Sequence, residues 1–93
     1  MHEMGIASSV LEAVMAEAAR HPGSRVTKVG MRIGGLAGVD RESLTFCFQV
    51  LVKDTDLEPA VLAIEDSPGA ELDLTYLELE EYGAGSARTQ GPE

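Results

Sequence analysis

Apolar residues recur with a helical period in two stretches of the chain, residues 4–19 and residues 40–52. In both stretches the apolar positions lie three or four residues apart, with charged residues between them. His21-Pro22-Gly23 ends the first stretch, and Asp40 is a good N-cap for the second. The apolar positions are Met4, Ala7, Val10 or Leu11, Val14, Met15 and Ala18, then Leu44, Cys47, Phe48 and Leu51. The pattern predicts two amphipathic helices with these positions facing a core.

Three further stretches alternate with the two-residue period of a strand: residues 25–33, 60–65 and 72–81. In the last of them the leucines change phase between Leu74 and Leu77. Such a change predicts either a bulge near Thr75-Tyr76 or burial of both faces of the strand.

The segment Ser67-Pro68-Gly69-Ala70 fits a type II turn, with proline second and glycine third. We expect this turn to close residues 60–65 and 71–81 into an antiparallel hairpin. The element order is then α-β-α-β-β, which predicts an α+β fold with two helices on one face of a three-stranded sheet. Residues 1–82 form the expected domain, and the polar residues 83–93 form an expected disordered tail.

Composition excludes several classes of function. The 93 residues carry a formal net charge of -9, which argues against a nucleic-acid partner. No apolar run approaches the roughly 18–20 residues of a bilayer helix, and no leader pattern opens the chain, so we expect a cytoplasmic protein with no membrane partner. A single cysteine, Cys47, rules out an internal disulfide and a multi-cysteine zinc site. No catalytic constellation stands out, and we expect no enzymatic activity.

The opening Met1-His2-Glu3 is a candidate metal site. A terminal α-amine, the amide nitrogen of residue 2 and the His2 imidazole lie within one chelate. Deprotonated backbone nitrogens with an imidazole suit Ni(II) or Cu(II) in a square-planar field. A histidine near a chain end is also often simply solvated, and the residues alone leave both interpretations open.

The segments "MHEMGIASSVLEAV", "RVTKVGMRIGGLAGVDRESLTFCFQVL" and "AVLAIED" together resemble the HypA/HybF family of hydrogenase nickel-incorporation proteins. The resemblance covers residues 1 to about 66 and resumes in "GAELDLTYLELEE". It implies a metallochaperone that binds Ni(II) at the amino-terminal Met-His-Glu for the maturation of NiFe hydrogenase. The implied partners are the maturation GTPase HypB and the hydrogenase large subunit, with urease maturation in some organisms.

Residue by residue, the resemblance implies that His2 is the nickel ligand, with backbone nitrogens near it. Glu3 is then a neighbouring site residue, and Asp40 lies close to the amino-terminal site. Met1 belongs to the predicted site through its α-amine, as part of the chelate described above. The family also carries a zinc domain with two Cys-x-x-Cys pairs between its second and third strands. Here Asp66-Ser67-Pro68-Gly69 joins the strands directly, so we expect no zinc.

Two questions stay open at this level. The chain could instead be a metal-independent interaction module that docks to the GTPase or to a hydrogenase precursor. The short connection between the last two strands also invites strand exchange, so either a monomer or a strand-swapped dimer is compatible with the sequence.

Overall fold

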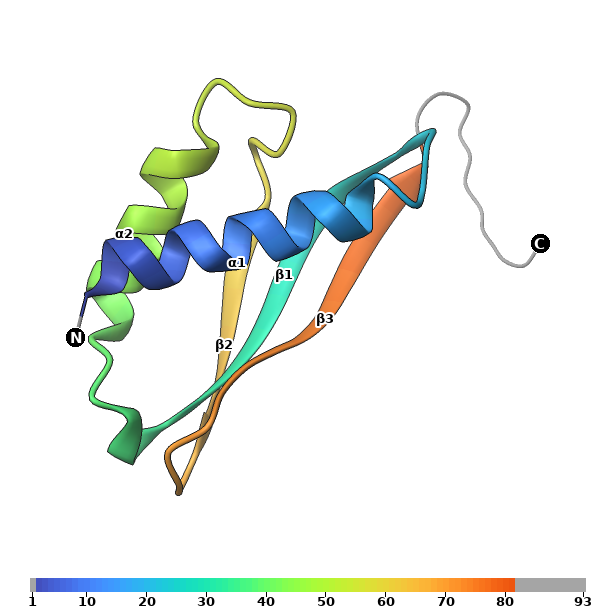
Figure 1. The fold of residues 1–93 in the computed structure, drawn as a ribbon. Coiled ribbons are helices and arrows are strands. Elements are labelled where there is room, and N and C mark those ends of the chain that lie inside the picture. Colours follow the sequence, from blue (N-terminus) through green and yellow to red (C-terminus); the bar gives the residue numbers. More distant parts are fainter. Residues whose placement is uncertain (1, 82–93) are drawn as a thin grey trace.

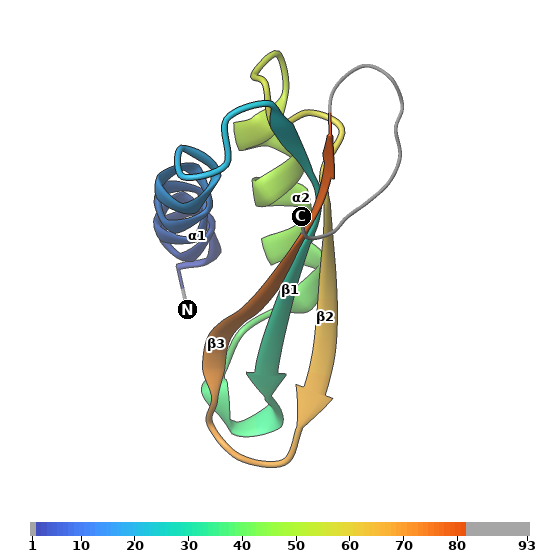
Figure 2. The same cartoon turned by 90° about the vertical axis from the view of Figure 1, so that its right-hand side faces the viewer.

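The computed structural model describes residues 2–81, and the expected disordered tail lies outside them. The elements are α1 (Glu3–Ala18), β1 (Ser24–Gly34), a short 3-10 helix η1 (Gly35–Ala37), α2 (Arg41–Val52), β2 (Val61–Ser67) and β3 (Leu72–Glu81). This is the predicted order α-β-α-β-β. Both helices lie on the same face of a three-stranded sheet, as predicted (Figure 1, Figure 2).

The sheet has β1 in its centre, with the order β2-β1-β3. β1 is parallel to β2 and antiparallel to β3, so the predicted hairpin between the last two strands is wrong. The reason is that α2 lies between β1 and β2 in the sequence, and a helical crossover returns the chain parallel to the strand that it left. The connection Pro68–Glu71 then crosses the end of β1 to reach the other edge of the sheet (Figure 2).

The predicted type II turn is also wrong, because Gly69 is not among the described glycines with a positive φ, which are Gly23 and Gly38. The segment instead bonds to the end of β1. The N–H of Gly34 donates to the carbonyl of Glu71 at 2.8 Å, and the N–H of Leu36 donates to the carbonyl of Gly69 at 2.9 Å. A Cβ atom on Gly34 would collide with that carbonyl of Gly69. Close backbone approach, and not a left-handed turn, is what requires a glycine here.

Of the two alternatives predicted for the last strand, the structure shows the bulge. The register with β1 shifts between Gly30 and Met31, which leaves Thr75 as the extra residue on β3. The shift restores a common face to the leucines on either side of Thr75. They lie opposite core residues of β1, in the pairs Leu72 with Ile33, Leu74 with Met31, Leu77 with Val29 and Leu79 with Val26.

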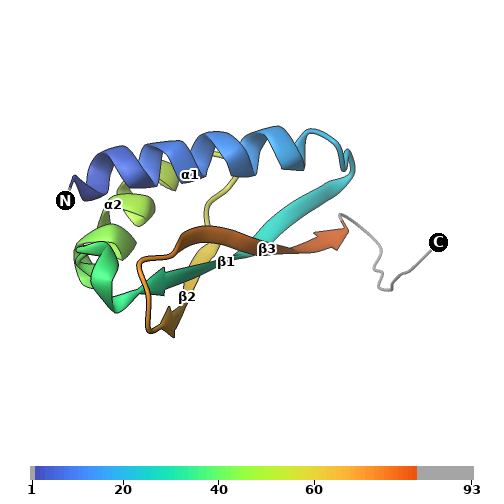
Figure 3. The same cartoon turned by 60° about the horizontal axis from the view of Figure 1, so that its bottom comes forward.

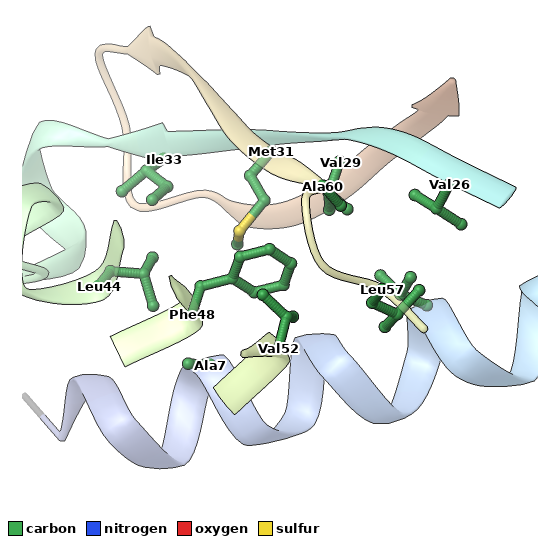
Figure 4. Packing of buried hydrophobic residues seen from close by; sticks show 11 residues of the cluster. Ala7, Val26, Val29, Met31, Ile33, Leu44, Phe48, Val52, Leu57 and Ala60 are labelled. Carbon is green, nitrogen blue, oxygen red and sulfur yellow. The ribbon is translucent and has the colours of Figure 1, made fainter. Parts of the chain in front are cut away.

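The core lies between α2 and the inner face of β1 (Figure 4). Phe48 of α2 is fully buried beside Met31 of β1, and Val52 lies next to it. The fully or nearly fully buried apolar residues are Ala7, Val14, Val26, Val29, Met31, Ile33, Leu44, Phe48, Val52, Leu57 and Ala60. Two predicted core positions of α1 are wrong, because Met4 and Met15 are 46% and 56% exposed. α1 packs mainly against α2. One helix covers a narrower stripe of the surface of α1 than a sheet would cover, so Met4 and Met15 stay exposed.

Within residues 2–81, neither helix is long and apolar enough to cross a bilayer.

Candidate metal centre

The amino-terminal ends of the two helices meet at one end of the molecule (Figure 1). His2 is the N-cap of α1, and Asp40 is the N-cap of α2. The carboxylate of Glu3, the first residue of α1, accepts the backbone N–H of Asp40 at 2.8 Å. Two of the four predicted site residues, Glu3 and Asp40, are thus brought together from positions 37 residues apart, and His2 directly precedes Glu3 in the chain. Met1 lies outside the described residues.

Local chemistry explains why α2 begins at this point. Asp40 has an extended backbone, and its Oδ1 accepts the N–H of Ser43 at 3.1 Å. Its carbonyl accepts the N–H of Leu44 at 2.9 Å, which closes the first helical turn. Glu42 adds a negative charge to that turn, where the helix dipole favours one. The predicted cap is confirmed, and it fixes the position of the Asp40 carboxylate.

The first turn of α1 leaves its backbone nitrogens free of helical partners. The first helical hydrogen bond runs from the N–H of Ile6 to the carbonyl of His2, at 3.1 Å. The N–H groups of residues 2–5 therefore have no acceptor within the helix. The side chain of His2 is exposed and makes no capping hydrogen bond. An amide of His2 or Glu3 can lose its proton here without breaking a helical hydrogen bond.

Electrostatics keep Glu3 ionised in this setting. The N–H of Asp40 that bonds to its carboxylate lowers the pKa of Glu3 below its ordinary value. The positive ends of the two helix dipoles act in the same direction. The residue that directly follows His2 therefore has a carboxylate that carries its negative charge at neutral pH.

Arg41 is a residue of this region that the sequence did not reveal. Its Nη2 donates to the carbonyl of Ile33 at the end of β1, at 3.3 Å. Its Nε lies 2.7 Å from Oδ1 of Asp66 near the end of β2, in an orientation that makes an ion pair and not a hydrogen bond. Arg41 thus connects the start of α2 to two strands, directly after Asp40. Asp66 lies 25 residues further along the chain, so no local sequence signal pointed to this pair.

The donors at this end of the molecule are an imidazole, two carboxylates and main-chain nitrogens. Among residues 2–81, no three side chains of His, Cys, Asp or Glu are grouped so that they alone could hold a metal ion. A metal here needs backbone nitrogen ligands in addition to His2. Ni(II) and Cu(II) accept deprotonated amides in a square-planar field, so such a donor set suits these two metals. It does not suit tetrahedral zinc.

The sequence also places the chain in a known family. Residues 1–72 match the protein family described as "Hydrogenase/urease nickel incorporation, metallochaperone, hypA". The chain belongs to this family.

Two curated relatives illustrate the likeness, and both are named "Hydrogenase maturation factor HypA". The protein of Pelodictyon phaeoclathratiforme is 44% identical over 69 residues, which are 74% of this chain and 59% of that protein. The protein of Chlorobaculum tepidum is 46% identical over 69 residues, which are 74% of this chain and 61% of that protein. The chain thus matches about three fifths of the length of these relatives.

A solved structure agrees with the fold. The solution structure of the Ni metallochaperone HypA from Helicobacter pylori superimposes with a TM-score of 0.65. The match covers 82% of this chain and 72% of that one, at 18% sequence identity. At this identity the likeness supports the arrangement of helices and strands.

Proposed function

We propose that this chain carries Ni(II) as cargo for the maturation of NiFe hydrogenase. The ligands are the imidazole of His2 and the backbone nitrogens beside it, with the α-amine of Met1 as a further donor. Glu3 and Asp40 supply negative charge next to the metal. The observation that carries the proposal is the 2.8 Å hydrogen bond between Glu3 and Asp40, which gathers the donors of two helix ends.

The chemistry of this site matches a carrier better than a permanent metal site. A chelate of main-chain nitrogens and one imidazole forms only when amide protons are lost, so its affinity depends on pH. Protonation of the same nitrogens offers a route to release the ion. The helix ends favour the negative charge of a deprotonated amide. Membership of a family described by nickel incorporation supports nickel over copper as the cargo.

Delivery requires partners, and we propose the maturation GTPase HypB and the hydrogenase large subunit. The family description, with hydrogenase and urease as destinations of nickel, supports this proposal. We place both events in the cytoplasm, and we propose that the chain itself has no enzymatic activity.

Replacement of His2 tests the proposal, and the chain contains its own control. Nickel is titrated into the native protein and into H2A and H21A variants, and binding is followed by calorimetry and visible absorption. The second histidine, His21, lies after the far end of α1 and interacts with Glu17, at 3.3 Å. We expect one Ni(II) per chain in the native and H21A proteins, with a yellow, diamagnetic complex, and no stoichiometric binding in H2A.

The same titration separates the proposal from a metal-independent docking module. Circular dichroism should be unchanged in H2A, because His2 precedes α1 and contributes nothing to the core. Tight stoichiometric nickel binding by H2A would refute the site and favour the docking module. An extension before Met1 should weaken binding, and the size of the loss reports whether the α-amine is a ligand.

A further inference from the structure

The apolar face of β3 is only partly covered by the helical layer. Leu74 and Leu79 are 38% and 37% exposed, although their side chains lie on the same face of the sheet as the core. α1 lies over β3 in Figure 3. Side chains of the two elements line a groove of about 610 Å³. Its walls are Ala13, Glu17 and His21 on one side and Leu74, Leu77 and Leu79 on the other, with Thr75 and Tyr76.

β3 also has a free edge. It pairs with β1 along one side, and within residues 2–81 no strand pairs along its other side. The bulge at Thr75 divides β3, and Tyr76–Glu81 is the longer part, although its register with β1 shifts once more where Leu79 and Glu78 pair with Val26 and Lys28. A free edge of this length is a template for another extended segment, and the groove lies beside this same stretch.

Charge determines which segment fits. On the outer face of the sheet, Glu78 and Glu80 of β3 lie opposite Lys28 and Arg25 of β1, at 3.9 and 2.6 Å. Both hydrogen bonds from Arg25 go to one oxygen of Glu80, and the ion pair of Lys28 is long. The side chains of Glu78 and Glu80 are 55% and 59% exposed, so both carboxylates retain acceptor capacity. An antiparallel copy of β3 would bring glutamates beside glutamates, which is unfavourable.

We propose that the edge of Tyr76–Glu81 is a docking site for an extended segment of a partner protein in which aliphatic and basic residues alternate. The partner segment adds a fourth strand to the sheet. Its aliphatic side chains fill the groove beneath α1, and its basic side chains lie beside Glu78 and Glu80. This site is separate from the nickel site and does not depend on nickel.

A synthetic peptide tests the proposal with the full chain. The probe is an eight-residue peptide of alternating valine and lysine with blocked ends, and its control has glutamate in place of each lysine. Binding is measured by calorimetry, and its location by amide shifts in two-dimensional NMR. We expect binding of the lysine peptide, with shifts in β3 and along α1, weaker binding at high salt, and no binding of the glutamate peptide.

Paired variants from the two sheet edges locate the site. L79K places a charge in the groove, and V61K places the same charge on the outer face of β2, where Val61 is 50% exposed. E78Q removes a carboxylate from the β3 edge, and E65Q removes one that pairs with Arg32 at the opposite edge. We expect L79K and E78Q to weaken peptide binding by about tenfold or more, and V61K and E65Q to leave it unchanged.

Three results would overturn the proposal: equal effects of the two variants in each pair, equal binding of both peptides, or dimerisation through β3 without peptide binding. The H2A protein keeps this test independent of the nickel proposal. Peptide affinity should be the same in H2A as in the native protein, with or without nickel. A protein that binds no nickel would therefore not contradict the docking proposal. A protein that binds no peptide would likewise not contradict the nickel proposal.

Discussion

The carboxylate of Glu3 accepts the backbone N–H of Asp40 at 2.8 Å, and this one hydrogen bond joins the beginnings of both helices. It gives Glu3 two roles. The side chain holds the start of α2 in place, and it brings a negative charge to the residue next to His2. Changes at Glu3 and Asp40 should therefore affect both folding and nickel binding, and suitable variants can separate the two effects.

The first prediction concerns acid stability. The pKa of Glu3 is lower in the folded chain than in the unfolded chain, because the N–H of Asp40 bonds to the ionised form. Its contribution is fully present above the ordinary carboxyl range of about pH 4–5 and is lost as the pH falls through the lowered pKa. E3Q should therefore be less stable than the native protein at pH 7 and equally stable at strongly acidic pH.

Urea unfolding at a series of pH values measures this difference. E12Q is the matched control, because Glu12 is exposed on the same helix. The idea fails if the gap in unfolding free energy between the native protein and E3Q is the same at acidic and neutral pH.

The second prediction separates the charge of Asp40 from its cap. Asparagine caps a helix about as well as aspartate, but alanine loses about 0.5–2 kcal/mol of stability. D40N should thus keep the thermal midpoint and lower nickel affinity, since it retains the acceptor for Ser43 and loses the charge. D40A should lower both. Thermal unfolding and nickel titration of the two variants measure these effects. Nickel binding by D40N with the affinity of the native protein would contradict the prediction.

Much of the fold was predictable because it depends on local pattern. The N-cap at Asp40 follows from neighbouring residues and is confirmed. The phase change of the leucines predicted either a bulge or burial of both faces, and the structure shows the bulge. The pairing of β2 was not predictable in this way. A strand pattern states which residues share a face, but the direction and neighbour of the strand depend on the path of the chain through α2.

The site was predictable to a lesser degree. The resemblance implied that His2, Glu3 and Asp40 are site residues, and this stays a prediction. Their spacing along the chain offered no reason to expect contact between Glu3 and Asp40, which the structure shows. The ion pair of Arg41 with Asp66 lacked any sequence signal for the same reason, since the two residues are distant along the chain. Long-range contacts between exposed polar side chains do not produce a periodic pattern in the sequence.

The third prediction concerns the close approach of two glycines. A Cβ atom on Gly34 would meet the carbonyl of Gly69, so G34A should push the β2–β3 connection away from the end of β1. We expect a loss of about 1–3 kcal/mol in unfolding free energy, as for other overpacked sites. The neighbouring G35A is the control, because a Cβ atom there meets nothing within 4 Å. Equal stability of the two variants would contradict the argument.

The fourth prediction concerns zinc. A structural zinc site built from two Cys-x-x-Cys pairs needs four thiolates, and the 93 residues contain one cysteine, Cys47, which packs half-buried against the core. The purified chain should hold no stoichiometric zinc and should keep its circular dichroism spectrum in excess chelator. Elemental analysis and thermal unfolding with and without chelator measure this. Unfolding in chelator would show that a structural metal is present after all.

The last prediction assigns Arg41 a positioning role for the nickel site. Its side chain bonds to Ile33 and pairs with Asp66, and it follows Asp40 directly, so it holds the amino-terminal end of α2 against the sheet. The pair is partly exposed, with 38% and 78% of the two side chains accessible, and exposed pairs contribute only about 0–1 kcal/mol. R41A should thus change stability little, and it should loosen the start of α2.

Hydrogen exchange at the Asp40 amide reports this loosening directly, because that N–H is the one held by Glu3. We expect faster exchange at Asp40 and weaker nickel binding in R41A. D66N, which removes the ion pair and leaves the contact with Ile33, should show a smaller change of the same sign. A purely structural role would instead lower the unfolding free energy and leave nickel affinity of the folded protein unchanged.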